Sequence, residues 1–130
     1  MDLDFLESGN VWQYIGMKIF RDPERGLGVH IKNIDELRQA YGAMHGGIVA
    51  TAIDAAVAVA VNDAYGKKFA ASTVELKVNY LLPMVDSDLF VFATLVKKGK
   101  QLTIATVEAI DGQKKLIAVG IATYMVKAID

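Results

Sequence analysis

The chain has 130 residues, of which 14 are basic and 15 acidic, and its formal net charge is −1. This length suits one domain with a substantial core, and the balanced charge favours neither nucleic acid nor an anionic membrane surface as a partner. The sequence contains no cysteine, which excludes disulfides, thiolate metal sites and cysteine nucleophiles. The N-terminal segment is acidic rather than apolar, so we expect a cytoplasmic protein without a signal peptide.

A short helix and two strands are predicted for the first part of the chain. The helix spans residues 3–15, and the strands span residues 16–21 and 27–32, with a turn at residues 22–26 between them. Apolar residues alternate with small or polar ones along the second strand, so one of its faces is expected to be buried. His30 falls on the other face, where we expect it to be solvated.

Residues 46–65 predict a long helix, because the segment is rich in alanine and exceeds the length of an ordinary strand. Gly66 is a suitable C-terminal stop. The apolar run at residues 48–61 is shorter than the roughly 20 residues that cross a membrane, and it contains Asp54. The helix is apolar nearly all round, so it must be covered on most sides, as in a soluble core.

Four strands are predicted after this helix, with turns at Gly99 and at Asp111–Gly112. Apolar residues alternate from Val74 to Tyr80 in the first of them. The four strands are residues 73–80, 89–97, 102–110 and 116–126. Consecutive strands with short turns form an antiparallel sheet, and a strongly curved sheet would cover the long helix. The sequence therefore predicts one α+β domain over residues 1–130.

Asp54 is the most unusual residue of the long helix, because no cationic residue lies three or four positions away. A buried carboxylate is costly unless another group partners it. One interpretation is structural: Asp54 caps another element or pairs with a distant lysine. The interpretation we favour is catalytic.

His45, Gly46 and Gly47 precede or begin the same helix. The first turn of a helix offers unpaired N–H groups and the positive end of the dipole, which suit a carbonyl oxygen or a developing oxyanion. From these residues alone, a tight turn into the helix is the simpler interpretation. His45 and Asp54 lie about 180° apart around a helix and about 13 Å apart along it. A site that uses both would therefore need two chains, as in a twofold dimer.

Three other polar residues are candidates for a site. Ser72 and Thr73 begin the strand after the helix, where either hydroxyl could hold a water or orient a carboxylate. An ordinary hydroxyl at the start of a strand explains them equally well. Gln39 lies six residues before His45, and by itself it is most simply a surface residue.

Together these residues resemble the hotdog-fold thioesterases, specifically the group typified by the phenylacetate-pathway enzyme and thioesterase superfamily member 2. That group carries Gly-x-x-His-Gly-Gly and an acid nine residues after the histidine, which Gly42–Gly47 and Asp54 match. The segment VELKVNYLLP, Val74–Pro83, also resembles the family's strand after the helix. The resemblance extends from about residue 12 to residue 126. It implies an α+β hotdog fold, in which a curved antiparallel sheet wraps around a long central helix.

The resemblance implies an acyl-CoA thioesterase acting on a small aryl or a short- or medium-chain acyl-CoA. The Gly46 N–H would polarise the thioester carbonyl, and Asp54 of a partner chain would act as nucleophile or as general base. His45 would orient groups around the thioester, and Ser72 would position the attacking water. Gln39 stands where the family commonly has asparagine, and it keeps the amide on a longer arm.

Substrate contacts and partners also follow from the resemblance. The expected pocket lies between chains beside the helix, and its candidate residues are Gly47, Ala50, Ile53, Val57 and Thr73. Lys97, Lys98 and Lys100 are candidates to contact CoA phosphates, although a solvated hairpin tip explains them at least as well. We expect a homodimer that pairs into a dimer of dimers, and neither a metal nor a cofactor.

Three other functions are alternatives. Acyl-thioester hydratases and dehydratases share the fold, but they typically carry Asp-x-x-x-x-His, and Arg25 and Ala40 stand five residues before the two histidines. A non-catalytic acyl-CoA sensor needs neither His45 nor Asp54. A purely structural oligomer would not explain Asp54. The sequence therefore favours a hydrolase.

Overall fold

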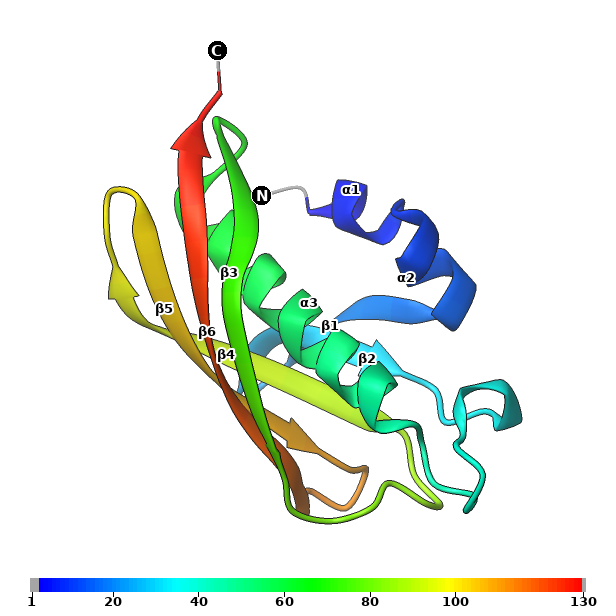
Figure 1. Cartoon of the computed structure of the whole chain (residues 1–130). Helices are drawn as coiled ribbons and strands as arrows, with labels where there is room; N and C mark the ends of the chain where they lie inside the picture. The colour runs from blue at the N-terminus through cyan, green and yellow to red at the C-terminus, as the bar shows by residue number, and fades with distance from the viewer. Residues whose placement is uncertain (1–2, 130) are drawn as a thin grey trace.

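The computed structural model describes residues 3–129, in which one long helix lies against a six-stranded antiparallel sheet (Figure 1). The elements in chain order are α1 (Asp4–Glu7), α2 (Asn10–Ile15), β1 (Met17–Asp22), β2 (Gly26–Ile31), the 3-10 turn η1 (Asp35–Leu37), α3 (Gly46–Tyr65), β3 (Phe69–Tyr80), β4 (Leu89–Lys98), β5 (Leu102–Ile110) and β6 (Leu116–Ala128). The strand order is β1-β2-β4-β5-β6-β3, and every neighbouring pair is antiparallel. The predicted α+β architecture is confirmed.

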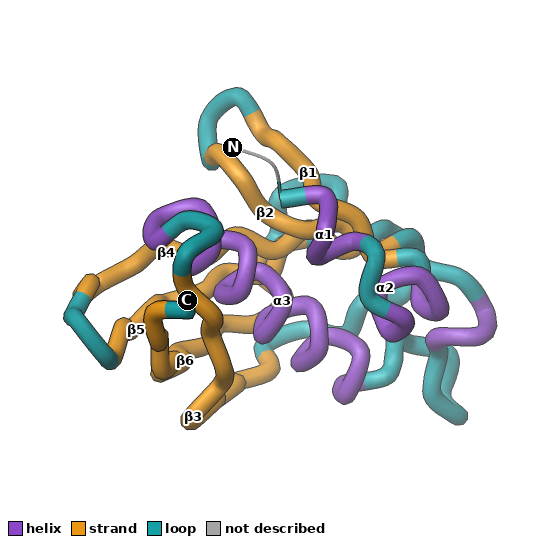
Figure 2. The backbone as a smooth tube through the Cα atoms, turned by 90° about the horizontal axis from the view of Figure 1, so that it is seen from above, coloured by secondary structure: helices purple, strands orange, loops and turns teal. Residues whose placement is uncertain are grey.

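The central helix α3 begins and ends where the sequence predicts. His45 is its N-cap, and Gly66 ends it with a positive φ of 86°. Figure 2 shows α3 running along the hollow side of the curved sheet. By length and composition α3 could also cross a membrane. In this fold it is instead the core helix, because its valines and several of its alanines are buried against the strands.

The sheet ends at β3, which pairs with β6 on one side and with no strand of residues 3–129 on the other. A β-bulge between Thr73 and Glu75 shifts the register of this pair. The bulge interrupts the alternation predicted from Val74 onward, and Val74 is 56% exposed. An edge strand of this length is a ready surface for pairing with another chain.

The N-terminal segment differs from the single helix predicted over residues 3–15. It forms the two short helices α1 and α2, because Gly9 adopts an extended conformation and Ser8 donates its hydroxyl hydrogen bond to the Phe5 carbonyl. Both helices lie on the side of α3 that the sheet leaves open (Figure 1). Leu6 and Trp12 pack against the core from this side.

The prediction that His30 is solvated is wrong. Its Nε2 lies 3.0 Å from Asp88 Oδ2, and its ring stacks on Phe90 at a centroid distance of 4.8 Å. The register explains this environment, because His30 lies directly opposite Phe90 on β4. The face of the sheet that turns away from α3 therefore carries an aromatic cluster near its β1 edge, with Phe20 at its centre.

Candidate active site

The start of α3 presents one backbone donor without a partner. His45 Nδ1 accepts a hydrogen bond of 2.9 Å from the Gly47 N–H, which caps the helix. Because Nδ1 is an acceptor, the ring proton of a neutral His45 lies on Nε2. The Gly46 N–H donates no hydrogen bond within residues 3–129. It is therefore available to a carbonyl oxygen, with the helix dipole in support.

A cavity of about 310 Å³ opens beside Gly46, and Gln39, Tyr80 and Leu82 are among the residues that line it. The Tyr80 hydroxyl donates a 2.6 Å hydrogen bond to the Gly46 carbonyl. The Gln39 side-chain oxygen accepts from the Tyr41 N–H at 2.5 Å, so its amide nitrogen is the part left for a ligand. The structure thus brings Gln39 and Gly46, two of the predicted site residues, to one cavity.

Asp54 is half-buried rather than fully buried, and hydroxyl groups hold it. Both hydrogen bonds reach the same oxygen: Thr73 Oγ1 lies 2.8 Å and the Tyr124 hydroxyl 2.6 Å from Asp54 Oδ1. Asp54 Oδ2 accepts no hydrogen bond from the described residues. One carboxylate oxygen is therefore fixed while the other is free to meet a substrate or a water.

Tyr124 is the site residue that the sequence does not reveal. It is 3% exposed, and its hydroxyl also lies 2.8 Å from the Asp54 carbonyl oxygen. Burial, together with its hydrogen bond to Asp54, raises the pKa of Tyr124 well above its ordinary value of 10.0. The hydroxyl consequently stays protonated, and remains a donor to Asp54, across the physiological pH range.

The two hydroxyl residues at the start of β3 lie on opposite faces of the sheet. Thr73 pairs with Tyr124 and faces α3, whereas Ser72 pairs with Met125. Successive residues of a strand point to opposite faces. Within one chain it is therefore Thr73, and not Ser72, that contacts Asp54.

Gly46 and Asp54 are not brought together within the chain. They are eight residues apart on one helix, which separates them by about 12 Å along the axis. The half-buried stripe of α3 that includes Asp54 also contains Ala50, Ala58 and Asn62. The prediction that Ile53 and Val57 line a pocket is wrong, because both face the sheet and are 0% and 1% exposed.

The predicted CoA-contacting lysines lie at the other end of α3. Lys98 Nζ donates a 3.1 Å hydrogen bond to the Ala64 carbonyl and lies 5.0 Å from the centre of the Tyr65 ring. This contact satisfies a carbonyl of the last helical turn, a structural role that the sequence does not suggest. Lys97 and Lys100 are exposed.

A curved antiparallel sheet around one helix, with a glycine turn at its start and a carboxylate at its middle, defines a hotdog-type protein. The sequence profile of the Thioesterase superfamily matches residues 41–118. A Saccharolobus solfataricus protein named "Putative esterase SSO1253" is 32% identical over 124 residues, which cover 95% of this chain and 81% of that protein. The chain belongs to the Thioesterase superfamily, and this membership supports hydrolase-type activity.

Solved structures agree with this assignment. A thioesterase family protein from Silicibacter pomeroyi is 30% identical with a TM-score of 0.88, over 96% of this chain and 94% of that chain. The BH2602 protein from Bacillus halodurans, solved with CoA, is 27% identical with a TM-score of 0.77, over 84% and 71%. The thioesterase HI1161 from Haemophilus influenzae has a TM-score of 0.90 over 98% and 89% at 18% identity, which shows the shared fold alone.

Proposed function

We propose that the protein is a cytoplasmic acyl-CoA thioesterase that works as a homodimer, with Asp54 as its reacting carboxylate. The observation that carries this proposal is the hydrogen bonding of Asp54. Two hydroxyls hold Oδ1, and Oδ2 is left without a partner from the described residues. An oriented carboxylate with one free oxygen suits a nucleophile or a general base.

The homodimer supplies the electrophilic half of the site. The free edge of β3 can pair with the same edge of a second copy about a twofold axis, which would place the two α3 helices side by side and antiparallel. If Gly46 of one chain faces Asp54 of the other, the midpoint of the two helices falls at Ala50. Alanine at that position allows the two helices to approach closely. The half-buried stripe of α3 therefore fits the pairing that the chemistry requires.

The proposed reaction uses the two groups on opposite sides of the thioester. The Gly46 N–H donates to the carbonyl oxygen and stabilises the negative charge that develops there. Asp54 Oδ2 of the partner subunit then takes the proton from a water that attacks the carbonyl carbon, and the C–S bond breaks to release the CoA thiolate. In the alternative route Oδ2 attacks the carbon itself and the C–S bond breaks to release the CoA thiolate, after which water hydrolyses the resulting mixed anhydride and regenerates the Asp54 carboxylate. Both routes yield a free acid and CoA.

The support for CoA as the thiol carrier is the similarity to the Bacillus halodurans protein that was solved with CoA. Gln39 borders the cavity at Gly46, so its free amide nitrogen can contact the carbonyl side of the substrate or the attacking water. His45 caps the same turn through Nδ1 and presents Nε2 outward. These positions suit the orienting roles that the resemblance implies.

The decisive experiment measures thiol release from a panel of aryl and aliphatic acyl-CoAs by the wild type and by Asp54→Asn. Removal of a general base or nucleophile should lower kcat by at least about 100-fold. Asp63→Asn, at an exposed position of the same helix, is the matched control and should keep full activity. Acyl-CoA binding without turnover by the wild type would instead indicate a sensor, and equal turnover by wild type and Asp54→Asn would remove Asp54 from the mechanism.

Gly46→Ala tests the other half of the site. A Cβ at Gly46 would meet only the Tyr80 ring, at an ordinary 3.5 Å, so the fold should accept the methyl group. The methyl would instead crowd the space in front of the Gly46 N–H. We expect kcat/KM to fall by about 100-fold, the scale of losing one oxyanion donor, with an unchanged melting temperature. Full activity would show that the carbonyl oxygen binds elsewhere.

A further inference from the structure

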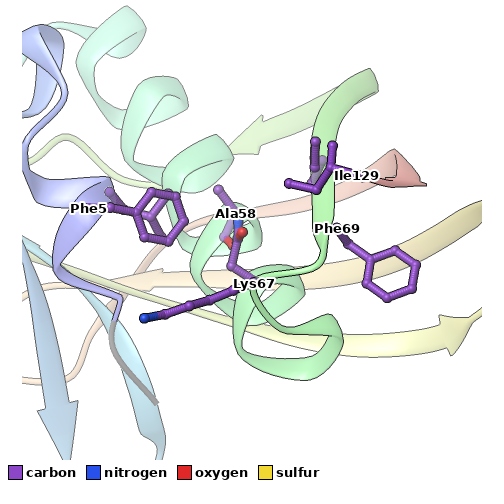
Figure 3. Close-up of a pocket in the computed structure, with 9 residues that line it drawn as sticks. Phe5, Ala58, Lys67, Phe69 and Ile129 are labelled. Carbon is purple, nitrogen blue, oxygen red and sulfur yellow. The ribbon is translucent and has the colours of Figure 1, made fainter.

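A second cavity, of about 550 Å³, lies along the C-terminal half of α3 (Figure 3). Four segments line the cavity: α1, the C-terminal half of α3 with the loop that follows it, the start of β3, and the residue after β6. The residues that line it are Phe5, Leu6, Ala58, Asn62, Lys67, Phe69, Ala70, Ala71 and Ile129. All but Asn62 and Lys67 are apolar, so the cavity suits a hydrocarbon group of a ligand.

Asp54 does not line the cavity, but it lies one helical turn from a residue that does. Ala58 follows Asp54 by one helical turn on the same stripe of α3, and Asn62 follows by two turns. Ala71 lies two residues before Thr73 on the same face of β3, ahead of the bulge. The residues of α3 and β3 that line the cavity therefore lie next to Asp54 and Thr73 in each element, and they extend from them toward the C-terminal end of α3.

The length of the cavity can be estimated from the helix. Two turns, from Asp54 to Asn62, correspond to about 12 Å. An extended alkyl chain advances about 1.25 Å per bond, because its C–C bonds of about 1.5 Å are inclined to the chain direction. About ten bonds therefore span the distance. A single aromatic ring on a short linker would fill only the part beside Ala58.

We propose that this cavity binds the acyl group of the substrate and that the preferred acyl group is a straight medium-length chain of about ten carbons. The inference rests on the proposed thioesterase function, because it places the thioester at Asp54. The acyl chain then runs past Ala58, whose small side chain leaves the cavity open. The chain ends near Asn62 and Lys67, where the apolar wall stops.

The helix α1 forms the outer wall of this acyl site. Figure 3 shows Phe5 pointing from α1 toward Ala58, and 54% of the Phe5 surface is exposed. Leu6 packs against the core, and Glu7 Oε2 accepts a 2.6 Å hydrogen bond from the Ile19 N–H of β1, so both residues help to hold α1 in place. An acyl chain beneath Phe5 would bury apolar surface on both partners.

The test is the chain-length profile of kcat/KM, measured with straight-chain acyl-CoAs from two to fourteen carbons and with benzoyl-CoA and phenylacetyl-CoA. For the wild type we expect a rise of about fourfold for each added methylene, which is the value of one buried CH₂ group, up to about ten carbons. Beyond that length the profile should level off or fall. The two aryl substrates should react more slowly than the ten-carbon substrate.

Ala58→Leu and its matched control Ala64→Leu locate the site. Leucine at position 58 projects into the cavity, so we expect the ten-carbon substrate to lose at least about tenfold in kcat/KM while the four-carbon substrate changes by less than about threefold. Ala64 is an exposed residue of the same helix outside the cavity, and Ala64→Leu should keep the wild-type profile. An equal loss at all chain lengths in Ala58→Leu would overturn the proposal.

Phe5→Ala provides a second variant that adds no bulk to the helix. It opens the outer wall, so KM for the ten-carbon substrate should rise several-fold while the four-carbon substrate is unaffected. A flat chain-length profile in the wild type, or a preference for aryl substrates, would overturn this inference. If turnover still depended on Asp54 in that case, the thioesterase function would stand. Absence of any thioester hydrolysis would refute the proposed function itself.

Discussion

Replacement of Tyr124 by phenylalanine removes one hydroxyl and leaves the buried ring in place. That hydroxyl donates the shorter of the two hydrogen bonds to Asp54 Oδ1, at 2.6 Å against 2.8 Å for the bond from Thr73. The packing of β6 on α3 should therefore survive, and the substitution tests one interaction. If orientation of the carboxylate matters for turnover, Tyr124→Phe should be slow although Tyr124 touches no substrate.

The size of the effect follows from the kind of hydrogen bond. A bond to a charged acceptor contributes about 1.5–3 kcal/mol, and 1.4 kcal/mol corresponds to tenfold. We therefore expect kcat to fall by between about 10-fold and about 100-fold, less than in Asp54→Asn, because Thr73 still holds Oδ1. KM should change by less than about twofold. The free energy of unfolding should fall by no more than about 1.5–3 kcal/mol, the contribution of the lost hydrogen bond, since the packing of the ring is kept.

Steady-state thiol release and urea denaturation measure these quantities on the same samples. The pKa of Tyr124 is raised by burial and by the nearby Asp54, so its hydroxyl stays protonated and the ratio of wild-type to variant kcat should be constant between pH 6 and pH 9. Thr73→Val, which removes the other hydroxyl, should also lower kcat. A Tyr124→Phe variant with wild-type kcat would refute the idea that this hydroxyl orients Asp54.

Two further predictions concern the sheet. Gly28→Ala should lower the free energy of unfolding by about 3 kcal/mol in urea denaturation, because its Cβ would collide with the Val91 carbonyl oxygen and would lie 2.5 Å from the Phe92 ring, whereas Gly9→Ala, with no such contact, should lose less; equal losses would contradict this. At Asp88, burial acts to raise the carboxyl pKa, but hydrogen bonds from His30 and a backbone N–H outweigh it and hold the pKa below 3.8. A lowered folded-state pKa stabilises the protein above about pH 4, and this contribution is lost as the pH falls below that value. Asp88→Asn should therefore lower stability at pH 7, by less than about 1 kcal/mol at this partly exposed site, and the difference from wild type should vanish in acid; a difference independent of pH would contradict this assignment.

The central helix and the order of the strands along the chain can be predicted from the sequence because their signals are local. An alanine-rich run of fixed length ended by Gly66, and turns at Gly99 and Asp111–Gly112, need no tertiary information. The break of the N-terminal helix at Gly9 and the bulge after Thr73 depend on packing against the rest of the protein. Propensity alone does not distinguish them from regular structure.

The site is predictable only in part, for the same reason. Asp54 stands out because a lone acid in an alanine and valine helix is a local anomaly. Tyr124 does not stand out in the sequence, because its pairing with Thr73 depends on the register of two strands that are about fifty residues apart in the chain. The sequence places Ile53 and Val57 on the pocket side of α3, whereas they face the sheet. A helix that is apolar nearly all round gives no pattern that distinguishes its two faces. In that helix the polar residues Asp54 and Asn62, two turns apart on one stripe, mark the face that turns away from the sheet.

That face explains why the helix is built from alanine rather than leucine. The larger side chains, such as Ile53 and Val57, fill the space between α3 and the sheet. On the opposite stripe, the proposed dimer needs a small residue at Ala50 for close approach of two helices, and the proposed acyl site needs one at Ala58 for an open cavity. Asp54 lies between them, one turn from each. Alanine thus keeps both sides of the carboxylate clear, and the half-buried position lets hydroxyl groups hold Asp54 without a cationic partner.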